Sequence, residues 1–282
     1  MTTVYVSIDM EGVAGISTLQ QVWRGSDDFP ASRRLMTLEA NAAVDGAFEG
    51  GATSVVVNDS HGDMYNLLAE ELDPRAELLT GTPKPWSMMQ GFSADFKVAL
   101  FIGYHAAAGT EAAVLDHTYS GRLLYEVRVN GAPVGEAEVN AALAGTYGVP
   151  VGLVAGDDKA CEQASKRLAG VRTVVVKKAY GRGVAQSMHP SRARDAIRAA
   201  SAEAVRAAAI GELKPYVAAP PFALEADLVN TSAADLCAMS PGCVRVGPRT
   251  VRFESADFVE AFRCLLTWTY LGASEAPRYA GT

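Results

Sequence analysis

Acidic residues and histidines follow three apolar segments of the sequence, and side chains of these types are the usual ligands of catalytic metal ions. The first segment, 4–8, is followed by Asp9 and, two residues later, by Glu11. Burying a carboxylate at the end of an apolar strand is costly unless a cation or several hydrogen-bond donors compensate it. Here two carboxylates need such compensation. A metal ion would compensate both. Because an aspartate at a strand end also commonly caps the next helix or turn, this segment alone leaves both interpretations open.

Two further segments repeat this pattern, and each leads to a histidine. Residues 54–57 precede a polar turn that contains His61, and two residues separate the segment 97–102 from His105. A helix predicted over 32–48 connects the first two apolar segments, which is typical of a parallel β-α-β unit. Ligands of open parallel sheets bind beyond the carboxyl ends of the strands. We therefore expect the polar residues after the three strands to meet at one edge of the sheet.

A further carboxylate, Glu136, stands in the first turn of a helix predicted over 136–147. Val139 and Leu143 mark the buried side of this helix, and Glu136 lies on that side one turn earlier. The candidates are then two histidines and three carboxylates. These are too many for one tetrahedral zinc ion with an open position, but they suit two adjacent metal ions that share a carboxylate. We expect Asp9 to be the bridge.

The composition indicates a globular protein and argues against two kinds of partner. Of 282 residues, 49% are hydrophobic and 20% charged, and the formal net charge is −7. No basic patch stands out, so nucleic acid is not expected as a partner. The N-terminus lacks the pattern of a signal peptide and the apolar runs are too short to cross a bilayer, which predicts a cytoplasmic protein without a membrane partner. The four cysteines form no CxxC pair and are expected to be buried, reduced thiols.

We predict an α/β fold, with a mostly parallel sheet flanked by helices and a second, smaller α+β domain. The alternation of strands and helices ends near residue 180, where an alanine- and arginine-rich helix and then short strands follow. The predicted domains are a metal-binding catalytic domain at 1–180 and the smaller domain at 181–282. A hairpin with the turn Asn130-Gly131 is predicted between 123–129 and 132–134.

Four other polar residues receive structural interpretations. Asp157 follows a strand and is expected to cap the next helix, with a ligand role as the less favoured alternative. Lys177 and Lys178 end a run of valines and are interpreted as a solvated strand end. His189 precedes a proline and is expected in a solvated loop.

Six spaced motifs occur along the chain. They are SIDMEG (7–12), NDSHG (58–62), GYHA (103–106), His-Thr at 117–118, VGE (134–136) with Asn140, and VAGDD (154–158). Together they resemble the zinc-dependent D-aminopeptidase family that is often encoded beside dipeptide transporters, and the likeness covers essentially the whole chain.

The resemblance implies a set of site residues and a function. The metal ligands that it implies are Asp9, Glu11, His61, His105 and Glu136. His117 corresponds to a catalytic histidine. The implied enzyme holds two zinc ions per subunit and uses water that they activate to remove N-terminal, D-configured residues from short peptides or aminoacyl amides. It also implies a homodecamer of two stacked pentameric rings. Manganese or cobalt stays open, since mixed nitrogen and oxygen ligands suit all three metals.

Two other functions fit the same residue types. A two-metal phosphoesterase would use Asp, His and Glu at strand ends equally well, although no Arg or Lys stands near the motifs to hold phosphate. A non-catalytic peptide-binding protein linked to transport is the second alternative. Such a protein has no need of two buried metal ions.

Overall fold

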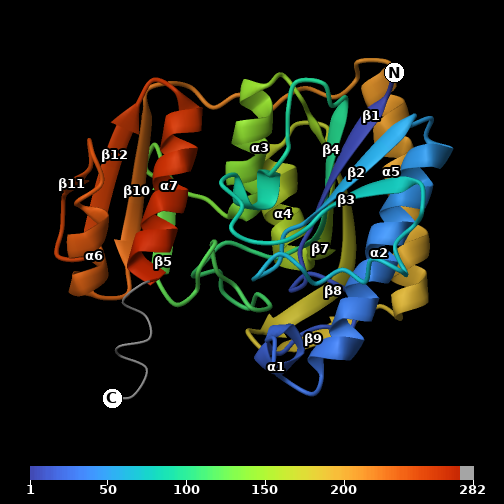
Figure 1. The fold of residues 1–282 in the computed structure, drawn as a ribbon, viewed down its shortest axis with the longest axis horizontal. Helices are drawn as coiled ribbons and strands as arrows, with labels where there is room; N and C mark the ends of the chain where they lie inside the picture. The colour runs from blue at the N-terminus through green and yellow to red at the C-terminus, as the bar shows by residue number, and fades with distance from the viewer. Residues whose placement is uncertain (274–282) are drawn as a thin grey trace.

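Two β-sheets form the framework of the protein (Figure 1). The computed structural model describes residues 1–273, so the last residues of the predicted second domain, 274–282, lie outside the described part. One sheet has seven strands and is mostly parallel, and the other has five antiparallel strands. The predicted fold class is therefore confirmed.

The strand order of the seven-stranded sheet reverses beside β1 (Thr3–Ile8), the first strand of the chain. Its order is β3 (Ala76–Leu79), β2 (Ser54–Asp59), β1 (Thr3–Ile8), β4 (Val98–Tyr104), β7 (Val151–Asp157), β8 (Arg172–Gly181) and β9 (Val184–Ser187). All neighbours are parallel except β9, which pairs antiparallel with β8. The chain builds outward from β1 to β3 and then returns to add β4 on the other side of β1. The crevice between β1 and β4 is thus the switch point at which α/β sheets bind ligands.

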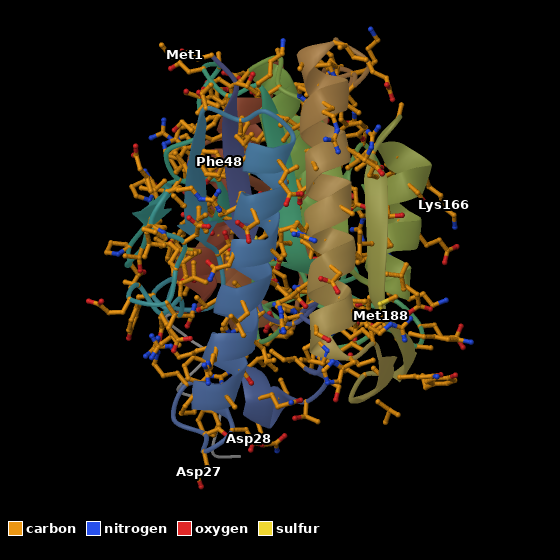
Figure 2. All side chains as sticks on the ribbon, turned by 90° about the vertical axis from the view of Figure 1, so that its right-hand side faces the viewer. Met1, Asp27, Asp28, Phe48, Lys166 and Met188 are labelled. Atoms are coloured by element: carbon orange, nitrogen blue, oxygen red, sulfur yellow. The ribbon has the colours of Figure 1, made fainter. Side chains whose placement is uncertain are left out.

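The central strands are buried on both faces because successive side chains enter different cores. Ile8 and Ile102 belong to one core, whereas Tyr5 and Phe101 belong to the other. Two long helices lie side by side over the first face (Figure 2), namely α2 (Phe29–Glu49) and α5 (Pro190–Ala209). The opposite face is covered by α3 (Glu136–Thr146) and α4 (Asp158–Arg167).

The five-stranded sheet packs its apolar side against two helices. Its order is β11 (Val244–Arg245), β12 (Thr250–Ser255), β10 (Phe222–Leu228), β5 (Leu124–Val129) and β6 (Ala132–Pro133). Residues of β10 alternate between buried and half-buried, as expected for a sheet with one covered face. The covering helices are α6 (Thr231–Cys237) and α7 (Phe258–Ala273), and α7 also contacts α3. The short helices α1 (Leu19–Val22) and η1 (Ser87–Met89) lie in loops.

The sheets do not follow a single cut of the chain at residue 180. The predicted hairpin forms, with Asn130 and Gly131 at φ 53° and 77°, but its strands join the five-stranded sheet because β5 pairs with β10. Conversely, β9 and α5 belong to the layers of the larger sheet. The boundary between 1–180 and 181–282 stays a prediction.

Two further properties concern the thiols and the helices. All four cysteines are free, and three of them are buried, whereas Cys243 is half-buried. Within residues 1–273, none of the helices combines the length and apolar character needed to cross a membrane.

Candidate metal centre

The carboxyl ends of three neighbouring strands place the candidate residues side by side. Asp9 follows β1, His61 lies two residues after β2, His105 follows β4, and Glu136 is the first residue of α3. The strands β2, β1 and β4 are adjacent in the sheet. All four residues are buried, as is Glu11. The structure brings these residues together, as the strand pattern predicts, and their role as metal ligands stays a prediction.

Two glycines allow the ends of β1 and β4 to approach this closely. A Cβ atom on Gly103, which has φ +69°, would lie 2.1 Å from the carbonyl oxygen of Asp9. A Cβ atom on Gly12 would lie 2.0 Å from the carbonyl oxygen of Tyr104. Because no side chain fits in either gap, both positions require glycine to keep Asp9 beside His105.

One ring nitrogen of His61 is hydrogen-bonded to the backbone, and the other faces the carboxylates of the cluster. Its Nε2 lies 2.8 Å from the carbonyl oxygen of Val22, which can only accept a hydrogen bond, so Nε2 is the protonated nitrogen. In the neutral ring Nδ1 then has a free lone pair, and it faces Glu11 Oε2 at 2.9 Å and Asp9 Oδ1 at 3.2 Å. A carbonyl that fixes the tautomer of a histidine in this way is the usual support of a metal ligand.

His105 has the same arrangement with its nitrogens exchanged. Its Nδ1 donates to the carbonyl oxygen of Ala106 at 3.0 Å. Its Nε2 lies 3.3 Å from Asp9 Oδ2 and 3.3 Å from Glu136 Oε2, and it is a buried atom without a hydrogen-bond partner among the described residues. A buried lone pair between two carboxylates fits a cation that all three would share.

Asp9 is the residue common to both halves of the site. Its Oδ1 faces His61 and its Oδ2 faces His105, as a bridging carboxylate requires. Possible ligand atoms of Asp9, Glu11 and His105 all lie within 4.8 Å of one another. Nitrogen and oxygen donors of this kind suit zinc, manganese or cobalt, so the residues present fit a bound metal.

The charges of the site are coupled. Burial raises the pKa of Asp9, and the adjacent Glu11 raises it further. Burial opposes protonation of the two histidines, but Glu11 beside His61 and Glu136 beside His105 outweigh it, so both imidazole pKa values lie well above their usual range. The cluster thus attracts positive charge, which either protons or metal ions can supply.

His117 stands at the mouth of the site. Its ring stacks on that of His105, with centroids 4.0 Å apart and planes at 12°. Its Nδ1 donates to the carbonyl oxygen of Leu115 at 2.8 Å, and its Nε2 lies 3.8 Å from Glu136 Oε1. The side chain of His117 is 20% exposed, whereas that of His105 is fully buried. His117 also forms a possible ligand group with His105 and Glu136, but its position at the mouth suits contact with substrate.

A second layer of hydrogen bonds fixes Glu136. The backbone N–H of Tyr119 donates to Glu136 Oε1 at 2.6 Å, and the Tyr119 hydroxyl donates to Asn140 Oδ1 at 2.8 Å. Asn140 Nδ2 lies 3.0 Å from the hydroxyl oxygen of Tyr104, which is 2.7 Å from Ser7 Oγ. This network joins α3 to β1 and β4, and supports of this kind hold ligands in place.

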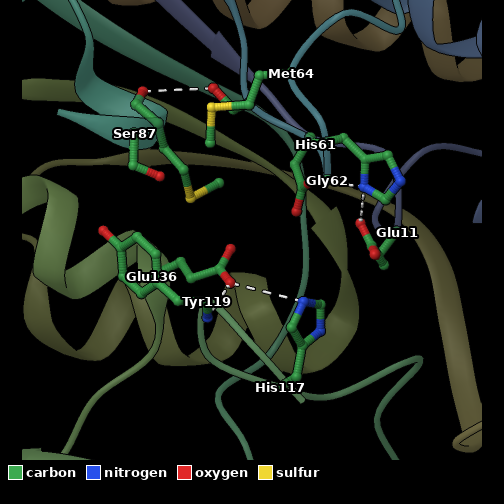
Figure 3. Close-up of a pocket in the computed structure, with 11 residues that line it drawn as sticks. Glu11, His61, Gly62, Met64, Ser87, His117, Tyr119 and Glu136 are labelled. Carbon is green, nitrogen blue, oxygen red and sulfur yellow. Dashed lines mark hydrogen bonds and ion pairs between the residues drawn. The ribbon is translucent and has the colours of Figure 1, made fainter. Parts of the chain in front are cut away.

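Two connected cavities open from the cluster. The smaller has a volume of about 110 Å³, with Glu136 and His117 on one side and Met64 and Ser87 on the other (Figure 3). The larger, of about 1010 Å³, shares four lining residues with the smaller. Its wall includes three cations, namely Arg24, Arg122 and Arg182. The expectation that no arginine lies near the motifs is therefore wrong, because Arg122 follows Thr118 by only four residues and the fold adds Arg24 and Arg182 from segments outside the motifs.

Three comparisons with known proteins agree. A family model described as D-aminopeptidase (Peptidase_M55) matches residues 2–267. A D-aminopeptidase of Bacillus subtilis (strain 168) is 36% identical over 271 residues, which make up 95% of this chain and 96% of that protein. The solved structure of the Zn-dependent D-aminopeptidase DppA from Bacillus subtilis, described as a self-compartmentalizing protease, matches with a TM-score of 0.89 and 35% identity. That match covers 96% of this chain and 98% of the other.

Lys177 corrects one interpretation of the sequence. It is not a solvated strand end, because it is only 1% exposed and points beneath the site. Its Nζ donates to the carbonyl oxygens of Glu11, Val13 and Ile16 at 2.5, 2.8 and 2.5 Å. Burial lowers the pKa of Lys177 to about 8. All three N–H bonds of the ammonium group thus hold the loop that contains Glu11, and only the register of β8, which turns this side chain inward, distinguishes it from exposed Lys178.

A buried carboxylate holds the same loop from α2. Glu39 is 1% exposed, and its Oε1 accepts a hydrogen bond from the backbone N–H of Ala14 at 2.9 Å. Burial raises the pKa of Glu39 to about 7. The sequence does not reveal this contact, since Glu39 is one of several charged residues in a long amphipathic helix.

We predict that Lys177→Met lowers the free energy of unfolding of the metal-free protein by about 3 kcal/mol, because three buried carbonyl groups lose their donor. The same change should weaken zinc binding, since the loop with Glu11 is no longer held. Lys178→Met is the matched control and should change stability by no more than about 0.5 kcal/mol. Urea unfolding and zinc titration would measure both effects, and equal behaviour of the two variants would contradict the role of Lys177.

Proposed function

The chain belongs to the D-aminopeptidase family, and from this we propose that it removes N-terminal D-amino acids from short peptides with the help of two zinc ions. That it is a metal-dependent aminopeptidase follows from the family. The observation that best supports a pair of metals is the orientation of Asp9, whose two oxygens face different imidazoles. The proposal of zinc rests on the Zn-dependent relative and on the donor set.

The ligands divide into two groups around Asp9. We assign His61 and Glu11 to one metal ion and His105 and Glu136 to the other, since these pairs approach within 2.9 and 3.3 Å. Asp9 would belong to both. When bound, the ions supply Lewis acidity that lowers the pKa of water and polarises a carbonyl group.

The protein's own residues would orient the peptide and move the proton. The smaller cavity, between Met64, Ser87 and Tyr119, would hold the N-terminal residue of the substrate. His117 keeps its Nδ1 proton on the carbonyl oxygen of Leu115, which leaves Nε2 to accept a proton and deliver it to the leaving amine. Burial of the ligands around this position excludes bulk water.

The two alternative functions have less support. A two-metal phosphoesterase could use the same ligands, and the arginines of the larger cavity could bind phosphate. A peptide-binding protein without turnover would have no need of a partly exposed histidine beside the cluster. Membership in a family of aminopeptidases favours peptide hydrolysis over both.

We also propose that the protein forms a homo-oligomer, as a decamer. The relative of known structure is described as a self-compartmentalizing protease, which for a single kind of chain implies assembly. Light scattering on the purified protein should give ten chain masses, and a monomer would contradict this proposal. The cytoplasmic location stays a prediction from the sequence.

The substrate proposal is tested with three compounds. Zinc-loaded protein should hydrolyse D-alanyl p-nitroanilide, should act weakly or not at all on the L-isomer, and should not hydrolyse p-nitrophenyl phosphate. Elemental analysis should find two zinc ions per chain, and removal by a chelator should abolish turnover. Preference for the phosphate ester would replace the proposal with its first alternative. Tight peptide binding without turnover would favour the second.

His117→Ala separates catalysis from metal binding. We expect kcat to fall by about two orders of magnitude, because the leaving amine loses its proton donor, while zinc content stays that of the unmodified protein. His189→Ala is the control, since His189 is exposed, caps α5 and lines neither cavity. Asp9→Ala and His105→Ala should instead lose zinc. Unchanged turnover in His117→Ala would remove this residue from the mechanism.

A further inference from the structure

The larger cavity lies where the leaving part of a substrate would be placed. Both cavities are lined by Glu11, His61, Gly62 and His117, so the larger one begins directly at the candidate metal centre. Its volume of about 1010 Å³ far exceeds the 110 Å³ of the smaller. If the N-terminal residue occupies the smaller cavity, the chain beyond the scissile bond must enter the larger one past His117.

One of the three arginines in this cavity is already engaged. Arg24 donates to the carbonyl oxygen of Tyr65 at 3.1 Å and lies 3.4 Å from a carboxylate oxygen of Asp63. Its guanidinium carbon also lies 3.8 Å from the centroid of the Tyr65 ring. Because these contacts use its charge and its flat face, Arg24 is a part of the wall.

A second arginine is held beside the proton-transfer residue. Arg182 Nε donates to Asp116 Oδ1 at 3.0 Å and its Nη2 to the carbonyl oxygen of Asp116 at 3.1 Å. A Cβ atom on Gly121 would lie 3.2 Å from Cβ of His117 and 3.8 Å from Arg182 Nη2, so the guanidinium group lies close to His117. The side chain of Arg182 is 52% exposed, and its Nη1 makes no hydrogen bond to any residue of 1–273. The geometry leaves Nη1 for a ligand.

The third arginine has no partner in the described part of the chain. Arg122 follows Gly121, is exposed and lines the cavity, yet it forms no ion pair or hydrogen bond with residues 1–273. Of the acidic residues in the same wall, Glu11 belongs to the metal centre and Asp63 pairs with Arg24. Only exposed Asp27 is left, on the segment after α1. The wall next to His117 therefore has unpaired positive charge.

We propose that Arg122 and Arg182 bind the C-terminal carboxylate of a short peptide substrate and so select free dipeptides and similarly short peptides. The inference rests on the proposed function and adds the group that the enzyme recognises beyond the scissile bond. In a dipeptide only one Cα separates the leaving nitrogen, which His117 must reach, from the carboxylate. Guanidinium groups pair with carboxylates through two parallel hydrogen bonds, which longer or amidated peptides could not form at this position.

The test compares a peptide that has this carboxylate with one that lacks it. D-alanylglycine and D-alanylglycinamide differ only at the C-terminus, and glycine adds no side chain. For the zinc-loaded enzyme, kcat/KM should be higher for the acid than for the amide. In Arg122→Gln the ratio of the two values should fall about tenfold, mainly through KM of the acid. Arg182→Gln should lower the ratio in the same direction. Arg198→Gln, an exposed arginine on α5 that pairs with Glu49, is the matched control and should leave the ratio unchanged.

An unchanged ratio in Arg122→Gln, or an equal loss for acid and amide, would overturn the proposal. If the unmodified enzyme hydrolyses neither compound, the proposed function fails. Calorimetric measurement of the binding of the same two compounds then tests the carboxylate site independently of turnover. Tighter binding of the acid that is lost in Arg122→Gln would support the carboxylate site. Equal affinity for acid and amide would refute it.

Discussion

The structure depends on one electrostatic constraint, which is the burial of three carboxylates at a single edge of a parallel sheet. Asp9, Glu11 and Glu136 are each no more than 5% exposed. Mutual repulsion and loss of hydration would make this arrangement unstable unless positive charge lay between them. Two imidazoles, with their outer nitrogens fixed by backbone carbonyl groups, direct their other ring nitrogens into the same space. The cluster is therefore arranged to bind cations, and most other features of the region support it.

The sheet topology supplies the place for this cluster. Because β1 and β4 are neighbours on either side of the switch point, no crossover connection covers the crevice between their carboxyl ends. Glycines at 12 and 103 bring these ends together, and Lys177 holds the loop after β1 from below. Glu136 comes from outside the sheet, on a helix that packs against α7, α4 and β4. The predicted ligands thus have different structural origins, and the fold defines their relative positions.

The two cavities divide the site into parts with different chemistry. The smaller is lined by the predicted ligands, two methionines and Tyr119, and its volume suits one residue of a substrate. The larger is open and has arginines in its wall. His117 borders both, stacked on a buried histidine and partly exposed to the larger cavity. Its position at this border is what distinguishes it from the other histidines of the cluster.

The sequence by itself determined the strands, the residues that follow them and the family motifs, because alternation, turn residues and polar strand ends are local signals. It did not determine which strands would share a sheet, because the hairpin predicted between 123–129 and 132–134 falls within the predicted first domain, whereas its strand β5 pairs with β10. Nor did it separate Lys177 from Lys178, since only the side of the strand that faces the core decides which of them is buried. Arg182 of the larger cavity likewise comes from a segment that is distant in sequence from His117. Pairing between distant segments decides such contacts, and only the tertiary structure shows it.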